Sequence, residues 1–184
     1  MTEITKKERN NFIRDCHMNF EGVKKAVENS PDIVNSYNEK MNESGLGAAG
    51  HMGNREIAEY LLANGAPLEL AAAAMLGMNK EVQAYLDKDA ELANSAGPHG
   101  ISVAFHAALS GDPEIMQLLW DAGAEDAVKK SLIGAVNKGH LELVKWLLAH
   151  DADTSVTNFQ DKTALVLAEE KGFTEIVELI QSPN

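Results

Sequence analysis

One segment recurs along this chain of 184 residues and constrains its fold more than any other feature. Its clearest copy runs from Gly139 to Leu148 and reads GHLELVKWLL. About six copies return, and the residues equivalent to Gly139 are Asn19, Gly53, Met78, Gly111, Gly139 and Gly172. Such a period is typical of a solenoid, in which each unit buries its apolar face only against its neighbours. We therefore expect a stack of helical hairpins whose function lies in its surface.

Every copy predicts the same hairpin. An alanine-rich first helix precedes the turn, as in residues 71–74, and a second helix with apolar residues at i, i+1, i+4 and i+5 follows it. Leu143, Val144, Leu147 and Leu148 show this spacing, which places them on one stripe of a helix. Glycine at the turn suits a helix end that needs a left-handed residue. The small residues of the first helices would let neighbouring hairpins approach closely.

The best copies, at residues 53–66, 111–124, 139–152 and 163–172, resemble the ankyrin repeat family. The family pattern runs TPLHxAAxxGHxx(I/V)VxxLLxxGA over about 33 residues. The resemblance covers roughly residues 5–181, although SGLG at 44–47 and SVAF at 102–105 replace the opening tetrapeptide. It implies an all-α ankyrin-repeat solenoid of the bacterial stand-alone type, as a single domain over 1–184. Its repeats would span approximately 5–35, 36–66, 67–93, 94–124, 125–153 and 154–184.

The spacings between the turn positions are uneven, at 34, 25, 33, 28 and 33 residues. In ankyrin repeats the connection between hairpins projects as a β-hairpin finger, and there is room for fingers around residues 36–44, 94–102 and 154–162. After Ala66 and Ala124 the next alanine-rich helix begins almost at once. We therefore expect shortened or missing fingers before repeats 3 and 5, which would leave three fingers separated by two notches.

The resemblance also implies that the two residues before each turn position point into a concave groove. These pairs change from histidine and methionine in the first two repeats, through aliphatic residues, to charged residues in the last. With the finger residues added, the expected partner-binding residues are His17, Met18, Tyr37, His51, Met52, Leu76, His99, Leu109, Ser110, Asn137, Lys138 and Phe159. Duplication alone also explains the shared His-Met pair, and Phe159 also fits a position tucked under its own finger.

Composition limits the partner classes. The hydrophobic content of 45% is that of a globular protein, and no window approaches the roughly 18 apolar residues of a membrane span. A net charge of −12 disfavours nucleic acid and anionic membranes, which need a concentrated basic surface. Cys16 is the only cysteine, so no internal disulfide forms, and a reducing compartment fits. We expect an unprocessed cytoplasmic monomer.

The six histidines prompt a search for a catalytic or metal site. His99 and His106 are seven residues apart and could converge with Asp112 or another carboxylate. That spacing matches no compact zinc motif, in which ligands lie closer in sequence. No glycine-rich phosphate loop, nucleophile elbow or Cys-x-x-Cys motif occurs. The sequence therefore predicts no cofactor, no metal and no catalytic residue.

His51 leaves one chemical alternative open, because it could form an acid–base pair with Glu43 or Asn42 beside the groove. An ordinary histidine on an exposed groove explains the same residue. We therefore expect a non-catalytic protein–protein interaction module that binds a partner through its groove and fingers. The alternatives are a small-molecule-binding protein or rare enzyme that uses the groove histidines, and a scaffold or immunity-type partner.

Overall fold

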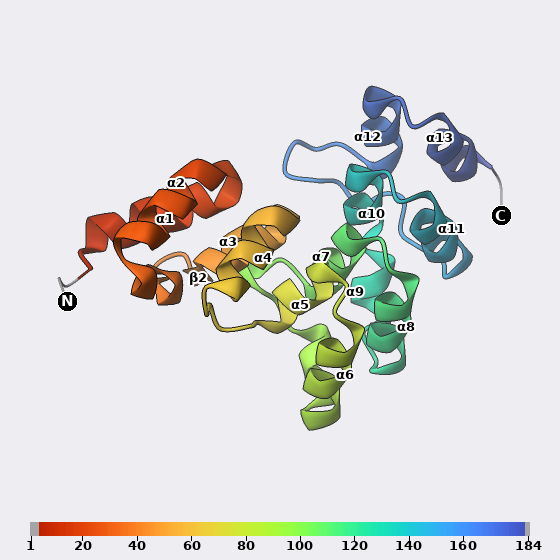
Figure 1. Ribbon diagram of the computed structural model, residues 1–184. Coiled ribbons are helices and arrows are strands. Elements are labelled where there is room, and N and C mark those ends of the chain that lie inside the picture. Colours follow the sequence, from red (N-terminus) through yellow and green to blue (C-terminus); the bar gives the residue numbers. More distant parts are fainter. Residues whose placement is uncertain (1–3, 183–184) are drawn as a thin grey trace.

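The computed structural model describes residues 4–182, which form a stack of helical hairpins (Figure 1). The first helices of the hairpins are α1 (Lys6–Met18), α3 (Gly45–His51), α5 (Leu70–Leu76), α7 (Val103–Ser110), α10 (Leu132–Lys138) and α12 (Ala164–Lys171). The second helices are α2 (Phe20–Asn29), α4 (Arg55–Ala63), α6 (Asn79–Lys88), α8 (Pro113–Asp121), α11 (Leu141–Ala149) and α13 (Thr174–Gln181). The prediction of an all-α repeat solenoid is confirmed.

The hairpins stack through their first helices. Each of these helices packs on the next, from α1 on α3 through to α10 on α12. The contact residues are small, and Ala72, Ala107 and Ala135 are fully buried. Each second helix covers the core with its apolar stripe, as predicted for Leu143 and Leu147 of α11, both fully buried. Because burial of one leucine side chain contributes about 1.5–3 kcal/mol, this repeated stripe is the main source of stability.

Left-handed glycines end most of the first helices. Gly111, Gly139 and Gly172 have φ values of 80°, 74° and 72° and cap α7, α10 and α12. In the third repeat, however, Gly77 takes this conformation, with φ of 75°, whereas Met78 precedes α6 as its N-cap. The assignment of Met78 to the turn was therefore wrong by one residue, since the left-handed conformation favours glycine.

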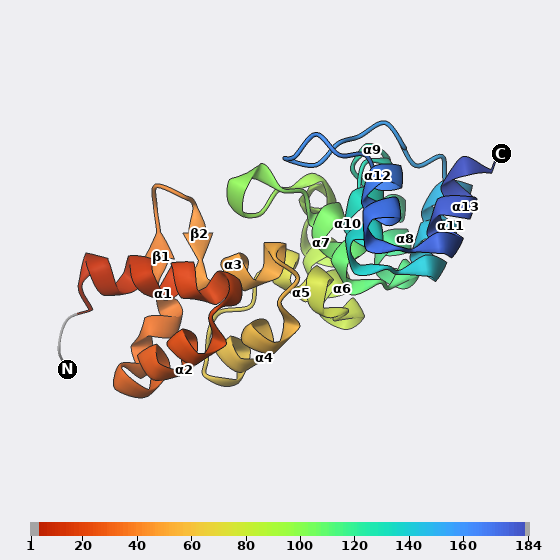
Figure 2. The same ribbon diagram turned by 90° about the horizontal axis from the view of Figure 1, so that it is seen from above.

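Three fingers project from the same side of the stack, as Figure 2 shows. The first contains the antiparallel pair β1 (Tyr37–Asn38) and β2 (Glu43–Ser44), which follows the 3-10 helix η1 (Pro31–Asn35). The second follows η2 (Ala90–Asn94), holds the 3-10 turn η3 (Pro98–Gly100), and closes through a bridge between Ala96 and Ser102. The third closes through a bridge between Thr157 and Thr163.

Both fingers that the spacing predicted to be shortened are replaced by other structure. Residues 64–69 form a turn and an irregular segment, and residues 125–129 form an additional short helix, α9 (Glu125–Lys129). Helix α9 was not expected from the sequence. Its one buried residue, Val128, anchors the helix on the core where a finger would otherwise begin.

Because the finger before the third repeat is missing, the second repeat contacts repeats beyond the third. Helix α3 of the second repeat contacts α7 of the fourth, and Nζ of Lys138 donates to the carbonyl oxygens of Met52 and Gly53 at 3.3 and 3.1 Å. As a result, Leu76 and Leu109 expose only 7% and 6% of their surface. The expectation that these two leucines line an open groove is wrong, because neighbouring repeats cover them.

A histidine and glutamate cluster as candidate functional site

The structure separates the predicted partner-binding residues into four groups. Leu76 and Leu109 are buried, and Ser110 and Asn137 are half-buried. The exposed residues are Met18, Tyr37, Met52, Lys138 and Phe159. Phe159 exposes 95% of its surface, so the alternative in which it tucks under its finger is wrong. The three remaining residues, His17, His51 and His99, converge on one point.

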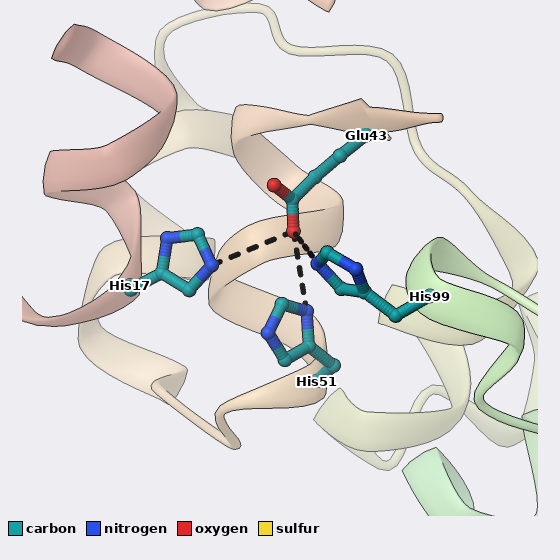
Figure 3. A group of neighbouring side chains, drawn as sticks. All are labelled: His17, Glu43, His51 and His99. Carbon is teal, nitrogen blue, oxygen red and sulfur yellow. Dashed lines mark hydrogen bonds and ion pairs between the residues drawn. The ribbon is translucent and has the colours of Figure 1, made fainter. Parts of the chain in front are cut away.

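That point is the carboxylate of Glu43 (Figure 3). Oε1 of Glu43 lies 3.5 Å from Nε2 of His17, 3.4 Å from Nδ1 of His51 and 3.2 Å from Nε2 of His99. One ligand atom from each of the four residues lies within 4.8 Å of the other three. We call these four residues the His-Glu cluster.

Four different elements supply the His-Glu cluster. His17 lies in the last turn of α1, Glu43 in β2 of the first finger, and His51 at the end of α3. His99 comes from η3 at the tip of the second finger. The cluster therefore joins the first and second repeats to the finger that leads into the fourth.

Local backbone structure aims two of these side chains. Nδ1 of His17 faces the carbonyl oxygen of Ile13 at 3.0 Å, which directs Nε2 toward Glu43. His99 has a positive φ of 58°, a conformation that costs a non-glycine residue about 1–2 kcal/mol. Such strain is retained where the surrounding structure requires it, often at functional sites.

The second finger reaches the cluster because it rests on α3. A Cβ atom at Gly47 would lie 2.7 Å from Cγ of Pro98, so the absence of a side chain at Gly47 permits this contact. With no finger between the second and third repeats, the tip that carries His99 occupies the free space. The short spacing in the sequence is thus the physical origin of the cluster.

Glu43 is the most unusual member, because its side chain has no exposed surface. Its ion-pair partners within the described chain are the three histidines, and its Oε2 atom has no hydrogen-bond partner there. Burial, followed by repulsion from His17 and His99, lowers the pKa of His51 to about 4. At neutral pH the His51 imidazole is therefore uncharged, and Glu43 is a buried acid without a permanent cationic partner.

The convergence of histidines considered around His106 does not form. The His106 ring is fully buried, with Nδ1 2.9 Å from the carbonyl oxygen of Ser102. Asp112 instead caps α8 by accepting a hydrogen bond from the backbone nitrogen of Glu114 at 2.8 Å. The suggested convergence of His99 with His106 and Asp112 is therefore wrong, since His99 turns toward Glu43.

The expected proximity of His51 to Glu43 is confirmed by the 3.4 Å between Nδ1 and Oε1, but His17 and His99 were not predicted to join the same group. The signal that could have linked them is the short spacing before the third repeat, which frees the second finger to cross the gap. The separations of 26, 8 and 48 residues between successive members give no motif.

The helical hairpins, turn glycines and fingers agree with a comparison against protein families. The sequence matches the family described as ankyrin repeats (3 copies) over residues 68–158 and 104–184. The chain belongs to the ankyrin repeat family. Ankyrin repeats are generally modules of protein–protein interaction and are typically not enzymes. The two hairpins that carry His17, Glu43 and His51 precede the matched residues, so this part of the ankyrin stack is defined by the structure.

No curated protein matches the sequence at the required level of similarity. Across residues 4–182, none of the helices combines the length and the apolar character needed to cross a membrane.

Proposed function

We propose that this ankyrin repeat protein binds a partner protein through its first helices and its three fingers. The observation that carries the proposal is the one-sided distribution of exposed large apolar side chains. Within residues 4–182 they are Met18, Tyr37, Met41, Met52, Phe159 and Val166. All six lie on first helices, at their ends or on fingers, and second helices contribute none.

This asymmetry favours recognition over chance exposure. Single exposed apolar residues are common on protein surfaces, but their restriction to one structural layer is typical of an interaction face. Phe159 at a finger tip offers a rigid aromatic anchor, and the flexible thioethers of Met18 and Met52 adapt to an irregular partner surface. Ser110, Asn137 and Lys138 would add polar contacts next to them. The proposal assigns this face no catalytic role.

Site-specific photo-crosslinking in the cell of origin tests this proposal. A photoreactive amino acid replaces Phe159 in one variant and Met52 in another, and the control variant carries it at Gln83, an exposed residue of α6. We expect one and the same protein to crosslink at positions 159 and 52 and not at position 83. Equal crosslinking at all three positions, or different proteins at 159 and 52, would contradict the proposed face.

A further inference from the structure

We propose that the His-Glu cluster of His17, Glu43, His51 and His99 binds a divalent transition-metal ion of the zinc type. The ion would fasten the second finger to the first two repeats. This inference does not depend on the proposed partner binding, because it uses only the contacts among these four residues.

The spacing of the ligand atoms supports a tetrahedral ion. Zinc binds imidazole nitrogen at about 2.0–2.1 Å and carboxylate oxygen at about 2.0–2.2 Å, so neighbouring ligand atoms of a tetrahedron lie about 3.3–3.5 Å apart. The three distances from Oε1 of Glu43 to the histidine nitrogens are 3.5, 3.4 and 3.2 Å. The carboxylate oxygen thus has about the separation from each nitrogen that a shared zinc ion requires, and the nitrogens, which lie within 4.8 Å of one another, would move closer together around the ion.

The hydrogen bond of His17 leaves room for a positive species between the ligands. Its Nδ1 lies 3.0 Å from the carbonyl oxygen of Ile13, so this nitrogen carries the proton and donates it. In the neutral ring, Nε2 then presents a lone pair to Oε1 of Glu43 at 3.5 Å, and two acceptors face each other. A metal ion between them removes this conflict. A backbone carbonyl that accepts from the second ring nitrogen is also the usual support of a metal-binding histidine.

The environment of Glu43 gives an independent reason to expect a bound metal ion. An ionised carboxylate is costly to bury unless it is paired with a cation and hydrogen bonded. Glu43 has no exposed side-chain surface, and Oε2 has no hydrogen-bond partner among the described residues. His51 meets Glu43 through Nδ1, which also lies 3.2 Å from the carbonyl oxygen of Gly47, so binding of an ion through this nitrogen requires the ring to leave that carbonyl. A divalent ion would supply the missing positive charge.

The cluster is accessible to an ion from one side. The His99 side chain is 39% exposed and that of His17 is 25% exposed, whereas Glu43 forms the closed floor. His99 lies at a finger tip and can move with that tip as an ion enters or leaves. Binding would then hold His99 in its strained left-handed conformation.

The ligand set selects the class of metal. Three imidazoles favour zinc and its neighbours in the transition series, whereas calcium and magnesium prefer sets made of oxygen ligands. Because all four positions of a tetrahedron are filled by side chains, the site would be closed in the manner of a structural zinc site. We therefore infer that the ion clamps the fingers and does not activate water.

Titration of the metal-free full chain with Zn²⁺ tests this inference. The protein is stripped with a chelator, and zinc binding is measured by competition with a chromophoric chelator of known affinity. Two variants remove ligands: His99→Gly, which suits the positive φ at that position, and Glu43→Gln, which preserves side-chain volume. His150→Gln is the matched control, because His150 stacks on Trp146 at 3.8 Å and lies outside the cluster.

We expect wild type and His150→Gln to bind one equivalent of Zn²⁺, and both ligand variants to bind at least about 100-fold more weakly, since even supporting residues affect affinity 10–100-fold. Circular dichroism spectra that match wild type would show that the variants are folded. Hydrogen exchange supplies a second readout, in which Zn²⁺ slows exchange in residues 94–102 of wild type only. The inference would be overturned by less than one equivalent bound to wild type, by unchanged affinity in both ligand variants, or by tighter binding of Ca²⁺ or Mg²⁺ than of Zn²⁺.

Discussion

Nε2 of His99 lies 3.2 Å from Oε1 of Glu43, although the two residues are 56 positions apart in the chain. The contact joins the tip of the second finger to strand β2 at the base of the first finger, and a complete third-repeat finger would keep the two apart. A loss of residues between the second and third repeats thus changes the ankyrin stack in two ways. It closes part of the groove over Leu76 and Leu109, and it brings four metal-binding side chains together.

The turn glycines should differ in their tolerance of alanine. A Cβ atom at Gly111 would lie 2.6 Å from Nδ1 of His140, whereas a Cβ atom at Gly172 has no neighbour within 4 Å. Both glycines have positive φ, so each alanine variant should lose about 1–2 kcal/mol of unfolding free energy. Gly111→Ala should lose about 1–3 kcal/mol more, because it displaces His140. Urea denaturation measures both losses, and equal values would contradict the close packing between these repeats.

Truncation of two phenylalanines should affect the unfolding free energy to very different extents. Phe12 is 1% exposed inside the first repeat, so Phe12→Ala should lower the unfolding free energy by about 3–5 kcal/mol. Phe159 is almost fully exposed, so Phe159→Ala should change it by less than about 0.5 kcal/mol. Thermal and urea unfolding check both values. A large loss for Phe159→Ala would show that this ring packs on the protein and is not free to anchor a partner.

The single cysteine should be unreactive in the folded protein. Cys16 is fully buried, and burial, followed by the nearby charges of Asp15 and Glu43, raises the pKa of its thiol. Since the thiolate is the reactive form, a thiol-specific reagent should not label native protein at pH 8 over the time in which it labels urea-unfolded protein completely. Rapid labelling without denaturant would mean that the first repeat opens readily.

Protonation of His106 should destabilise the protein as the pH falls. Nδ1 of the His106 ring lies 2.9 Å from the carbonyl oxygen of Ser102. The ring lies beside Gly97, and Phe105 and His51 are close to it. Burial lowers the pKa of His106 below its usual 6.5, so the unfolded chain takes up a proton more readily than the folded one. The stabilising contribution is therefore complete above about pH 6.5 and is lost as the pH falls, at up to about 1.4 kcal/mol per pH unit.

His106→Leu isolates this effect from the titration of the His-Glu cluster. With a chelator present throughout, the unfolding free energy of wild type should fall more steeply between pH 6.5 and 5 than that of the variant. Identical slopes would show that His106 is not held neutral by burial.

Much of the fold could be predicted because it repeats. The apolar stripe of α11, the alanines of the first helices and the turn glycines each depend on local spacing, and six copies reinforce the same pattern. The missing fingers followed from counting residues between turns. The prediction was wrong by one residue in the third repeat, where Met78 was aligned to the turn position that Gly77 occupies.

The His-Glu cluster could be predicted only in part, because its geometry depends on how repeats pack and not on local sequence. His51 and Glu43 are eight residues apart and were recognised as a possible pair. His17 and His99 join them only because α1 packs on α3 and the second finger rests on Gly47. The burial of Leu76 and Leu109 has the same origin, since contact between nonadjacent repeats has no signature in either repeat alone.

A crystal structure of the full chain with Zn²⁺, with anomalous data recorded on both sides of the zinc absorption edge, tests the central claim most directly. We predict one strong zinc peak about 2.0–2.2 Å from Oε1 of Glu43 and from one ring nitrogen each of His17, His51 and His99. A zinc-bound crystal whose anomalous peaks all lie elsewhere, with these four side chains still in contact, would contradict the account.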